Sequence, residues 1–358
     1  MNSFFRRTFF PTLIFGAVFL QRPASCQADY QILVTNEKSD DMTIISGTDH
    51  QPVATVPVGK RPRGIQASPD WKTVFIAVSG TPMSSPPQLD SNGNPMFKKN
   101  DDDEDDKKAD KSADGIAVMD LAQRKVVHKI KVGSDPEQLA VSKDGKHLYV
   151  SNEDVSTATV LNITSGKVEH IIPVSREPEG VTTSPDGKFF YVMCESEGEI
   201  YVVDAQAYRV IAHFKVGGRP RSAAFLPDGS KAFVPSESAG QLHVIDSVKH
   251  AVLKTIALPA GSRPMCVQVS RDGKKVYVST GRSGTVCVVD ANSYEILNTI
   301  KVGKRPWGIA VSPDGKFLYS ANGPSDDVSI VDLALEKEIG RIKVGSSPWG
   351  IAIVPRRE

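Results

Sequence analysis

The stretch "VGKRPWGIAVSPDGKFLYSAN" at residues 302–322 decides the fold, because a close copy, "VGKRPRGIQASPDWKTVFIAV", occupies residues 58–78. One proline anchors each copy, and the same frame recurs along the chain. The anchors are Pro62, Pro136, Pro178, Pro220, Pro264, Pro306 and Pro348, with successive gaps of 74, 42, 42, 44, 42 and 42 residues. A period of about 42 residues is typical of an architecture built from one supersecondary unit per repeat.

Each repeat contains four short apolar runs, such as "WGIAVS", "FLYSAN", "DVSIVD" and "RIKVG" after Pro306. Ser-Pro-Asp-Gly-Lys joins the first two runs, as a turn in which proline presets φ and glycine accepts a positive φ. Runs rich in Val, Ile and Tyr between turn residues are strands, and no segment has a helical period. The sequence therefore predicts an all-β, seven-bladed β-propeller of four-stranded antiparallel blades.

The two ends of the repeat region complete each other. The segment from Tyr30 onward supplies only the second, third and fourth strands of a blade, whereas "PWGIAIVP" at residues 348–355 supplies only a first strand. We therefore expect the N- and C-terminal strands to share one blade and to close the ring.

Residues 1–28 have the shape of a secretory signal peptide. Arg6 and Arg7 precede an apolar run at 13–20, and small residues follow in "PASCQA". The predicted domains are this signal at 1–28 and the propeller at 29–358, which places the protein in the periplasm or outside the cell. Lipidation of Cys26 is the alternative. No other apolar stretch is long enough to span a membrane.

Composition excludes some partners. The 358 residues include 43 basic and 42 acidic side chains, for a net charge of +1, which gives no reason to expect nucleic acid. Beyond the signal, Cys194, Cys266 and Cys287 are irregularly spaced and are predicted to be free, buried thiols. No sequence motif indicates a cofactor, and none is expected.

Several phrases resemble the YVTN-family β-propeller repeat proteins. They are "LYVSN" at 148–152, "VTNEKSDDMTIIS" near the start and the recurring "GIAVSPDGK" frame. Within that family the chain is most similar to the subgroup associated with PQQ-dependent alcohol catabolism. The resemblance implies a propeller and a periplasmic binding or scaffold role.

In a propeller, the loops that enter the innermost strands surround one mouth of the channel. The positions on either side of each anchor proline should lie there. In order they are Arg61 and Arg63, Asp135 and Glu137, Glu177 and Glu179, Arg219 and Arg221, Arg263 and Met265, Arg305 and Trp307, Ser347 and Trp349.

These side chains suggest a ligand site for an anionic or aromatic small molecule, or for a protein partner. Arginines bind carboxylates or phosphates through paired hydrogen bonds, and adjacent tryptophans stack on flat rings. The predicted ligand-binding residues are Arg61, Arg63, Glu137, Glu179, Arg219, Arg221, Arg305, Trp307 and Trp349. Alternatively, the arginines and carboxylates pair with each other and the tryptophans plug the channel.

Four glutamates follow the second strand of different repeats: Glu37, Glu153, Glu195 and Glu237. A carboxylate ring could bind a divalent cation. We expect these loops to lie further out and the glutamates to cap backbone N–H groups, so no metal site is predicted.

An insertion at about 80–114 separates the second and third strands of the first complete repeat. It contains "KKNDDDEDDKKADK" at 98–111, and such charge blocks are usually disordered. A lid or docking tail over the mouth is the functional alternative.

No nucleophile elbow, zinc-protease motif or phosphate loop is present, so the catalytic residues, if any, are unknown. The main functional prediction is an exported binding or interaction module that is accessory to periplasmic quinoprotein metabolism and is not itself an enzyme. The alternative is a lactonase-type propeller hydrolase, whose catalytic groups come from scattered loops that no motif reveals.

Overall fold

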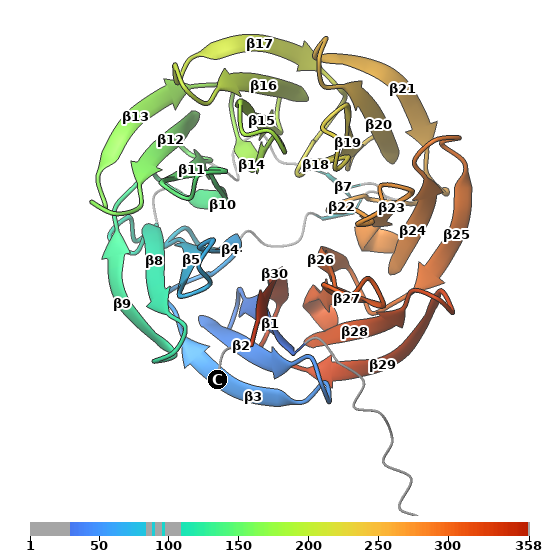
Figure 1. Ribbon diagram of the computed structural model, residues 1–358, viewed down its shortest axis with the longest axis horizontal. Coiled ribbons are helices and arrows are strands. Elements are labelled where there is room, and N and C mark those ends of the chain that lie inside the picture. The colour runs from blue at the N-terminus through green and yellow to red at the C-terminus, as the bar shows by residue number, and fades with distance from the viewer. Residues whose placement is uncertain (1–28, 84–87, 90–94, 97–108, 357–358) are drawn as a thin grey trace, which may run out of the picture.

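The computed structural model describes residues 29–83, 88–89, 95–96 and 109–356, which form a ring of seven four-stranded antiparallel blades around a channel (Figure 1). The predicted signal peptide lies outside these residues. Within them, helix is limited to two single turns, η1 (Gly281–Ser283) and η2 (Gly323–Ser325). None of the described helices is long and apolar enough to cross a membrane. The predicted fold class is confirmed.

The strands of each blade are given from the innermost outward. The closing blade contains β30 (Pro348–Pro355), β1 (Tyr30–Asn36), β2 (Asp41–Ser46) and β3 (Pro52–Pro57). The second contains β4 (Ile65–Ala67), β5 (Thr73–Val78), β8 (Gly115–Asp120) and β9 (Lys125–Ile130). The third contains β10 (Pro136–Val141), β11 (His147–Asn152), β12 (Thr157–Asn162) and β13 (Val168–Pro173).

The remaining four blades follow the same pattern. The fourth contains β14 (Pro178–Thr183), β15 (Phe189–Cys194), β16 (Glu199–Asp204) and β17 (Val210–Lys215). The fifth contains β18 (Ala224–Phe225), β19 (Lys231–Ser236), β20 (Gln241–Asp246) and β21 (Ala251–Ala257). The sixth contains β22 (Val267–Val269), β23 (Lys275–Ser279), β24 (Thr285–Asp290) and β25 (Ile296–Lys301). The seventh contains β26 (Pro306–Val311), β27 (Phe317–Asn322), β28 (Asp327–Asp332) and β29 (Lys337–Lys343).

The ring closes as predicted. β30 pairs antiparallel with β1, with Ala352 opposite Leu33 and Ile353 opposite Ile32. The C-terminal strand is therefore the innermost strand of the blade that the N-terminal segment begins (Figure 1).

The hydrophobic core lies between neighbouring blades. The second strand of a blade is covered on both faces, which explains why runs such as "HLYVSN" are apolar without strict alternation. Tyr149 on β11 stacks on Phe190 on β15 of the next blade, with ring centroids 4.0 Å apart. Each sheet thus buries its two faces against its neighbours.

The anchor proline has a regular backbone role. In six blades the residue before it has a positive φ, which is uncommon outside glycine. These residues are Arg61, Asp135, Glu177, Arg219, Arg305 and Ser347, with φ between 45° and 62°. Four innermost strands begin at the anchor proline, and the other three begin three or four residues after it. The residue after the proline has the same position in the repeat in every blade.

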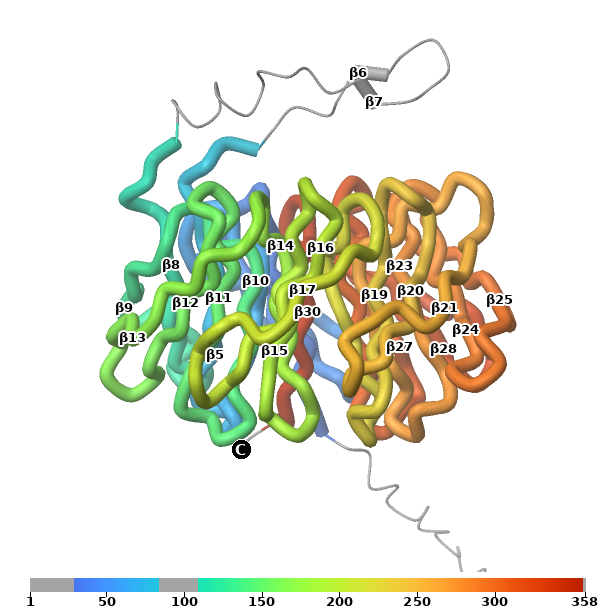
Figure 2. The backbone as a smooth tube through the Cα atoms, turned by 90° about the horizontal axis from the view of Figure 1, so that it is seen from above, coloured from blue at the N-terminus to red at the C-terminus, as the bar shows by residue number. Residues whose placement is uncertain are grey.

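The insertion leaves the ring at one end of the channel. β5 pairs directly with β8, and residues 79–83 and 109–114 rise from the same face of the disc (Figure 2). Lys60 Nζ lies 2.7 Å from Asp110 Oδ2, and the Gly80 N–H donates to Asp114 Oδ1 at 2.8 Å. Between these stems, β6 (Gln88–Leu89) pairs with β7 (Pro95–Met96). Most of the predicted disordered charge block lies outside the described residues.

Candidate functional site

The residue after each anchor proline contributes to one ring of side chains, which we call the mouth ring. Its members, in blade order from the second blade, are Arg63, Glu137, Glu179, Arg221, Met265, Trp307 and Trp349. Four consecutive blades therefore present charged groups, and the other three present a methionine and two tryptophans. The ring has a charged half and an aromatic half.

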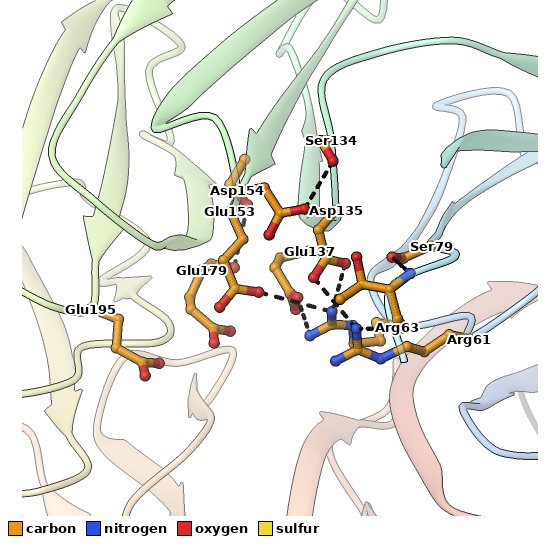
Figure 3. A network of polar contacts seen from close by, with 12 residues as sticks. Arg61, Arg63, Ser79, Ser134, Asp135, Glu137, Glu153, Asp154, Glu179 and Glu195 are labelled. Atoms are coloured by element: carbon orange, nitrogen blue, oxygen red, sulfur yellow. Dashed lines mark hydrogen bonds and ion pairs between the residues drawn. The ribbon is translucent and has the colours of Figure 1, made fainter. Parts of the chain in front are cut away.

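Arg63 is the centre of a buried ion-pair cluster (Figure 3). Its Nη2 lies 2.9 Å from Asp135 Oδ1, and its Nη1 contacts the carboxylate of Glu137. Its Nε lies 3.8 Å from Glu37 Oε1. The Arg63 side chain is 6% exposed and that of Glu137 is fully buried. Because an unpaired buried charge costs several kcal/mol, these groups depend on one another.

Arg221 forms a second, similar cluster three blades further on. Its three guanidinium nitrogens lie 2.6 Å from Glu179 Oε1, 2.9 Å from Glu195 Oε2 and 2.8 Å from Glu237 Oε2. Each nitrogen thus faces a different carboxylate, a multidentate arrangement for which the planar guanidinium is suited.

Two further arginines, each just before an anchor proline, lie on the rim of these clusters. Arg61 pairs with Glu37 at 3.1 Å and with Asp135 at 3.4 Å, and it donates to the Thr81 carbonyl at the base of the insertion. Arg219 contacts Glu195 and lies 3.3 Å from Glu237.

The aromatic half consists of stacked side chains. The rings of Trp307 and Trp349 are 5.7 Å apart at an interplanar angle of 27°. The guanidinium carbon of Arg305 lies 4.8 Å from the Trp307 ring centroid, and that of Arg221 lies 5.7 Å from it. The Arg305 side chain is exposed and has no carboxylate within ion-pair distance among the described residues. It is therefore available to an anion.

The mouth contains more carboxylates than guanidinium groups. The two clusters bring together seven carboxylates and the four arginines Arg61, Arg63, Arg219 and Arg221. The carboxylates are Glu37, Asp135, Glu137, Glu153, Glu179, Glu195 and Glu237. Like charges in a buried site oppose one another's ionisation. The excess of carboxylates over arginines therefore favours the protonated form of some of the carboxyls.

Three carboxyls have raised pKa values. Burial raises the pKa of Glu137 well above its usual value, against the attraction of Arg63. Burial likewise raises the pKa of Glu195, although the positive charge of Arg221 acts in the opposite direction. Burial and the neighbouring Glu179 raise the pKa of Glu153 to about 7.

Three other carboxyls remain ionised. Burial opposes ionisation of Asp135, but Arg63 and Arg61 outweigh it and lower the pKa of that group. Burial is similarly outweighed at Glu179, whose pKa is lowered mainly by Arg221. The pKa of Glu237 is also lowered, because Arg221 and Arg219 outweigh its burial.

Glu153 combines a neutral pKa with access to solvent. Its side chain is 24% exposed, whereas Glu137 beside it is fully buried. Its Oε2 lies 4.0 Å from Arg63 Nη2, the longest contact of that arginine. A carboxyl that exchanges a proton near pH 7 and can be reached by water is suited to act as a general base.

A cavity of about 470 Å³ runs along the channel and reaches the mouth ring. Glu179, Arg221, Trp307 and Trp349 all line it, so charged and aromatic side chains face one space. This is the size of a small-molecule site.

The predicted ligand-binding residues gather around this mouth, and the ion pairing predicted as their alternative is present. Six of the seven charged ones lie in the two clusters, and Arg305, Trp307 and Trp349 form the opposite wall. Whether any of them binds a ligand stays a prediction.

The expectation for the four glutamates after the second strands is wrong. They do not lie further out; Glu37, Glu153, Glu195 and Glu237 all contact the arginines. In each case the glutamate N–H donates to the carbonyl of the positive-φ residue before the anchor proline, at 2.8–3.1 Å. That bond folds the loop inward. Their equivalent positions in four repeats were the signal that could have placed them in the site.

Asp135, Glu137 and Glu153 also form a group whose carboxylate oxygens lie within 4.8 Å of one another. Three oxygen ligands at this spacing could begin a cation site. The guanidinium of Arg63 contacts the first two of them, so a positive charge already occupies the space between these carboxylates. The donor set therefore fits a metal poorly.

The three cysteines within the described residues are free, as expected. Cys194 and Cys287 are buried, whereas Cys266 is half-buried and lines the cavity. Burial raises the pKa of all three thiols.

Two family models match parts of the chain. Residues 180–344 match the family described as "Lactonase, 7-bladed beta-propeller", and residues 78–189 match the "YNCE-like beta-propeller" family. A sequence search of curated proteins gave no significant match. The chain is thus similar to propellers of these two families, and neither match tests the narrower resemblance to the YVTN family.

Several solved structures share the fold. The periplasmic gluconolactonase of Pseudomonas aeruginosa is 21% identical with a TM-score of 0.68, covering 91% of this chain and 99% of that one. A candidate 6-phosphogluconolactonase of Bacteroides fragilis is 18% identical with a TM-score of 0.71, covering 93% and 100%. Hydrazine synthase of Kuenenia stuttgartiensis is 18% identical with a TM-score of 0.71, covering 85% and 92%. Such likeness shows the fold alone.

The lactonase match corrects the main functional prediction. An exported binding or interaction module accessory to quinoprotein metabolism was expected, with catalysis only as the alternative. The match over residues 180–344 contradicts that main reading and favours the alternative, a lactonase-type propeller.

Proposed function

We propose that the protein hydrolyses a small hydroxylated lactone at the channel mouth. The lactonase match and the gluconolactonase among the similar structures support this reaction class. Lactone hydrolysis needs a base for water, a positive group beside the carbonyl oxygen and a surface that orients the ring. The described residues offer one candidate for each.

The observation that carries the proposal is the state of Glu153. Its pKa of about 7 leaves a substantial fraction ionised at neutral pH, and its side chain is 24% exposed. In the proposed step Glu153 removes a proton from water while the water oxygen bonds to the lactone carbonyl carbon. The ring C–O bond then breaks, and the same proton is delivered to the leaving oxygen, which gives a hydroxy acid.

Arg221 is the candidate for stabilising the charge that develops on the carbonyl oxygen. It lines the cavity, and Glu179 and Glu237 fix its guanidinium from two sides. A positive group held in place before the reaction needs little reorganisation when negative charge forms.

Trp307 and Trp349 are the candidates for orienting the lactone ring. Trp349 is buried, and its stacked partner Trp307 is half-buried where the cavity meets the mouth. Carboxylates such as Glu179 on the facing side can accept hydrogen bonds from ring hydroxyls. A hydroxylated lactone ring placed between the two halves of the mouth ring would therefore stack on the tryptophans and donate hydrogen bonds to the carboxylates.

The proposal includes export. Residues 1–28 carry the predicted signal, and a periplasmic gluconolactonase has a similar fold.

A pH-stat assay of the full mature chain on a panel of aldonolactones, homoserine lactones and aryl esters tests the function. We expect aldonolactone hydrolysis well above the spontaneous rate and a loss of about 10²–10⁴-fold in kcat for Glu153→Gln. Glu295→Gln, an exposed glutamate before β25, is the matched control and should retain full activity. Absence of turnover on every lactone, or unchanged activity of Glu153→Gln, would overturn the proposal.

A further inference from the structure

A second ring of side chains lies deeper in the channel. It is formed by the residue three positions after each member of the mouth ring, and we call it the channel ring. Its positions are Gln66, Ala140, Thr182, Ala224, Gln268, Ala310 and Ala352, of which the first five line the cavity. Three polar side chains thus alternate with alanines on the second, fourth and sixth blades.

The polar members of the channel ring have unused hydrogen-bonding groups. Gln66 on β4 and Gln268 on β22 both line the cavity, and neither side-chain amide bonds to another described residue. Thr182 Oγ1 on β14 donates to the Ala223 carbonyl at 3.1 Å and can still accept. Each amide offers two donors and one acceptor oxygen.

The deeper part of the cavity carries no charge. The charged residues among those that line the cavity are Glu179 and Arg221, and both belong to the mouth ring. A charged group placed beside the channel ring would find no ionic partner there and would lose its hydration. A neutral, hydroxylated group would find amide donors and acceptors.

The channel is too deep for one sugar ring to occupy all of it. Three residues of strand separate the two rings, which is about 10 Å. At about 30 Å³ per water molecule, the cavity volume of about 470 Å³ corresponds to on the order of fifteen waters. A lactone ring held at the mouth by the tryptophans would leave the channel ring without a ligand.

We propose that the channel ring binds a neutral glycosyl substituent, so that the preferred substrate is an aldonolactone carrying a second sugar unit. The inference rests on the proposed lactone hydrolysis at the mouth and names its substrate class. Gln66 and Gln268 are the specificity-determining residues. They bind the part of the substrate that does not react.

The test compares glucono-1,5-lactone with the lactones of cellobionic and maltobionic acid on the full mature chain. We expect a higher kcat/KM for a glycosylated lactone, and for Gln66→Ala and Gln268→Ala a loss of about threefold to tenfold each on that substrate alone. Hydrolysis of gluconolactone should remain unchanged in both variants. Gln206→Ala, an exposed glutamine in the turn before β17, is the control.

A second readout does not depend on turnover. Binding of the open acids cellobionate, maltobionate and gluconate is measured by quenching of tryptophan fluorescence and by calorimetry. Tighter binding of a glycosylated acid that weakens in Gln66→Ala supports the channel site, even if no lactone is hydrolysed and the proposed function fails. Hydrolysis of gluconolactone with equal kcat/KM for the glycosylated lactones would overturn the channel site and leave the proposed function standing.

Discussion

Glu153 Oε2 lies 4.0 Å from Arg63 Nη2, across the boundary between the second and third blades. The same guanidinium lies 2.9 Å from Asp135 and directly contacts Glu137. Its charge is therefore shared among carboxylates, and Glu153 receives the smallest part of it. Burial and the neighbouring Glu179 raise the pKa of Glu153 to about 7, and the distant Arg63 offsets little of that rise. At Asp135 the attraction of Arg63 and Arg61 outweighs burial, so this carboxyl stays ionised.

The rate should depend on the ionisation of Glu153. Because the base form of this carboxyl predominates above its pKa of about 7, we expect kcat/KM for a lactone to rise as the pH increases through about 7 and then to level off. Initial rates between about pH 5.5 and pH 8.5, corrected for spontaneous hydrolysis, measure the profile. A rate independent of pH over this range would contradict the assignment.

Stability should fall between about pH 4.5 and about pH 7. A carboxyl whose pKa is raised from 4.5 to about 7 on folding contributes stability below about pH 4.5, and this contribution is lost as the pH rises to about 7. We expect Glu153→Gln to raise the melting temperature at about pH 8 while it lowers activity, because it removes a poorly compensated charge. Calorimetry of both proteins at several pH values measures this, and a variant that melts lower at pH 8 would contradict it.

Two arginines at the mouth should differ in their effect on stability. Arg221→Met leaves Glu179, Glu195 and Glu237 without their shared partner, and we expect a loss of about 3–5 kcal/mol in the free energy of unfolding. Arg305→Met removes an exposed group that has no carboxylate partner among the described residues, and it should change the free energy of unfolding by less than about 1 kcal/mol. Urea denaturation compares the two variants, and equal losses would show that the Arg221 cluster is not structural.

Calcium should not stabilise the protein. The guanidinium of Arg63 contacts Asp135 and Glu137, two of the three carboxylates that could begin a cation site. A ligand that binds only the folded state raises the melting temperature. We therefore expect no shift on adding millimolar Ca²⁺ or EDTA, and a concentration-dependent rise with Ca²⁺ would reveal a metal centre.

Removing β30 should be far more damaging than shortening the insertion. Without residues 348–358, β1 loses its partner strand, and buried side chains that remain, such as Ile32 and Leu33, lose about 1.5–3 kcal/mol each. Deleting residues 84–108 leaves the pairing of β5 with β8 intact. Thermal melts and light scattering of the two deletions should show aggregation of the first and a nearly unchanged midpoint of the second.

The ring could be predicted from the proline frame alone, because each repeat signals its own strands and turns locally. The mouth ring followed from the same frame, since Arg63 or Trp307 needs only its distance from an anchor proline to be placed. Glu153 was not placed in this way, although a glutamate recurs at its position in four repeats. Its position depends on a bond from its N–H to the carbonyl of Asp135, whose positive φ the sequence does not reveal.

The charge balance of the two clusters could not be predicted from the sequence either. Counting arginines and carboxylates suggests pairing, but only the structure shows that several carboxylates share each guanidinium. A raised pKa depends on burial and on the remaining partners, as Glu137 and Glu179 illustrate by shifting in opposite directions in adjacent blades.

The strand shared by the two ends has a consequence for biosynthesis. During translation β1 is made first, yet its inner edge has no partner until β30, the last strand, has been made. Trp349 lies on that last strand, so the aromatic half of the mouth is also incomplete until then. A ribosome-bound nascent chain can therefore form individual blades, but it acquires the assembled mouth only after synthesis has reached its final strand.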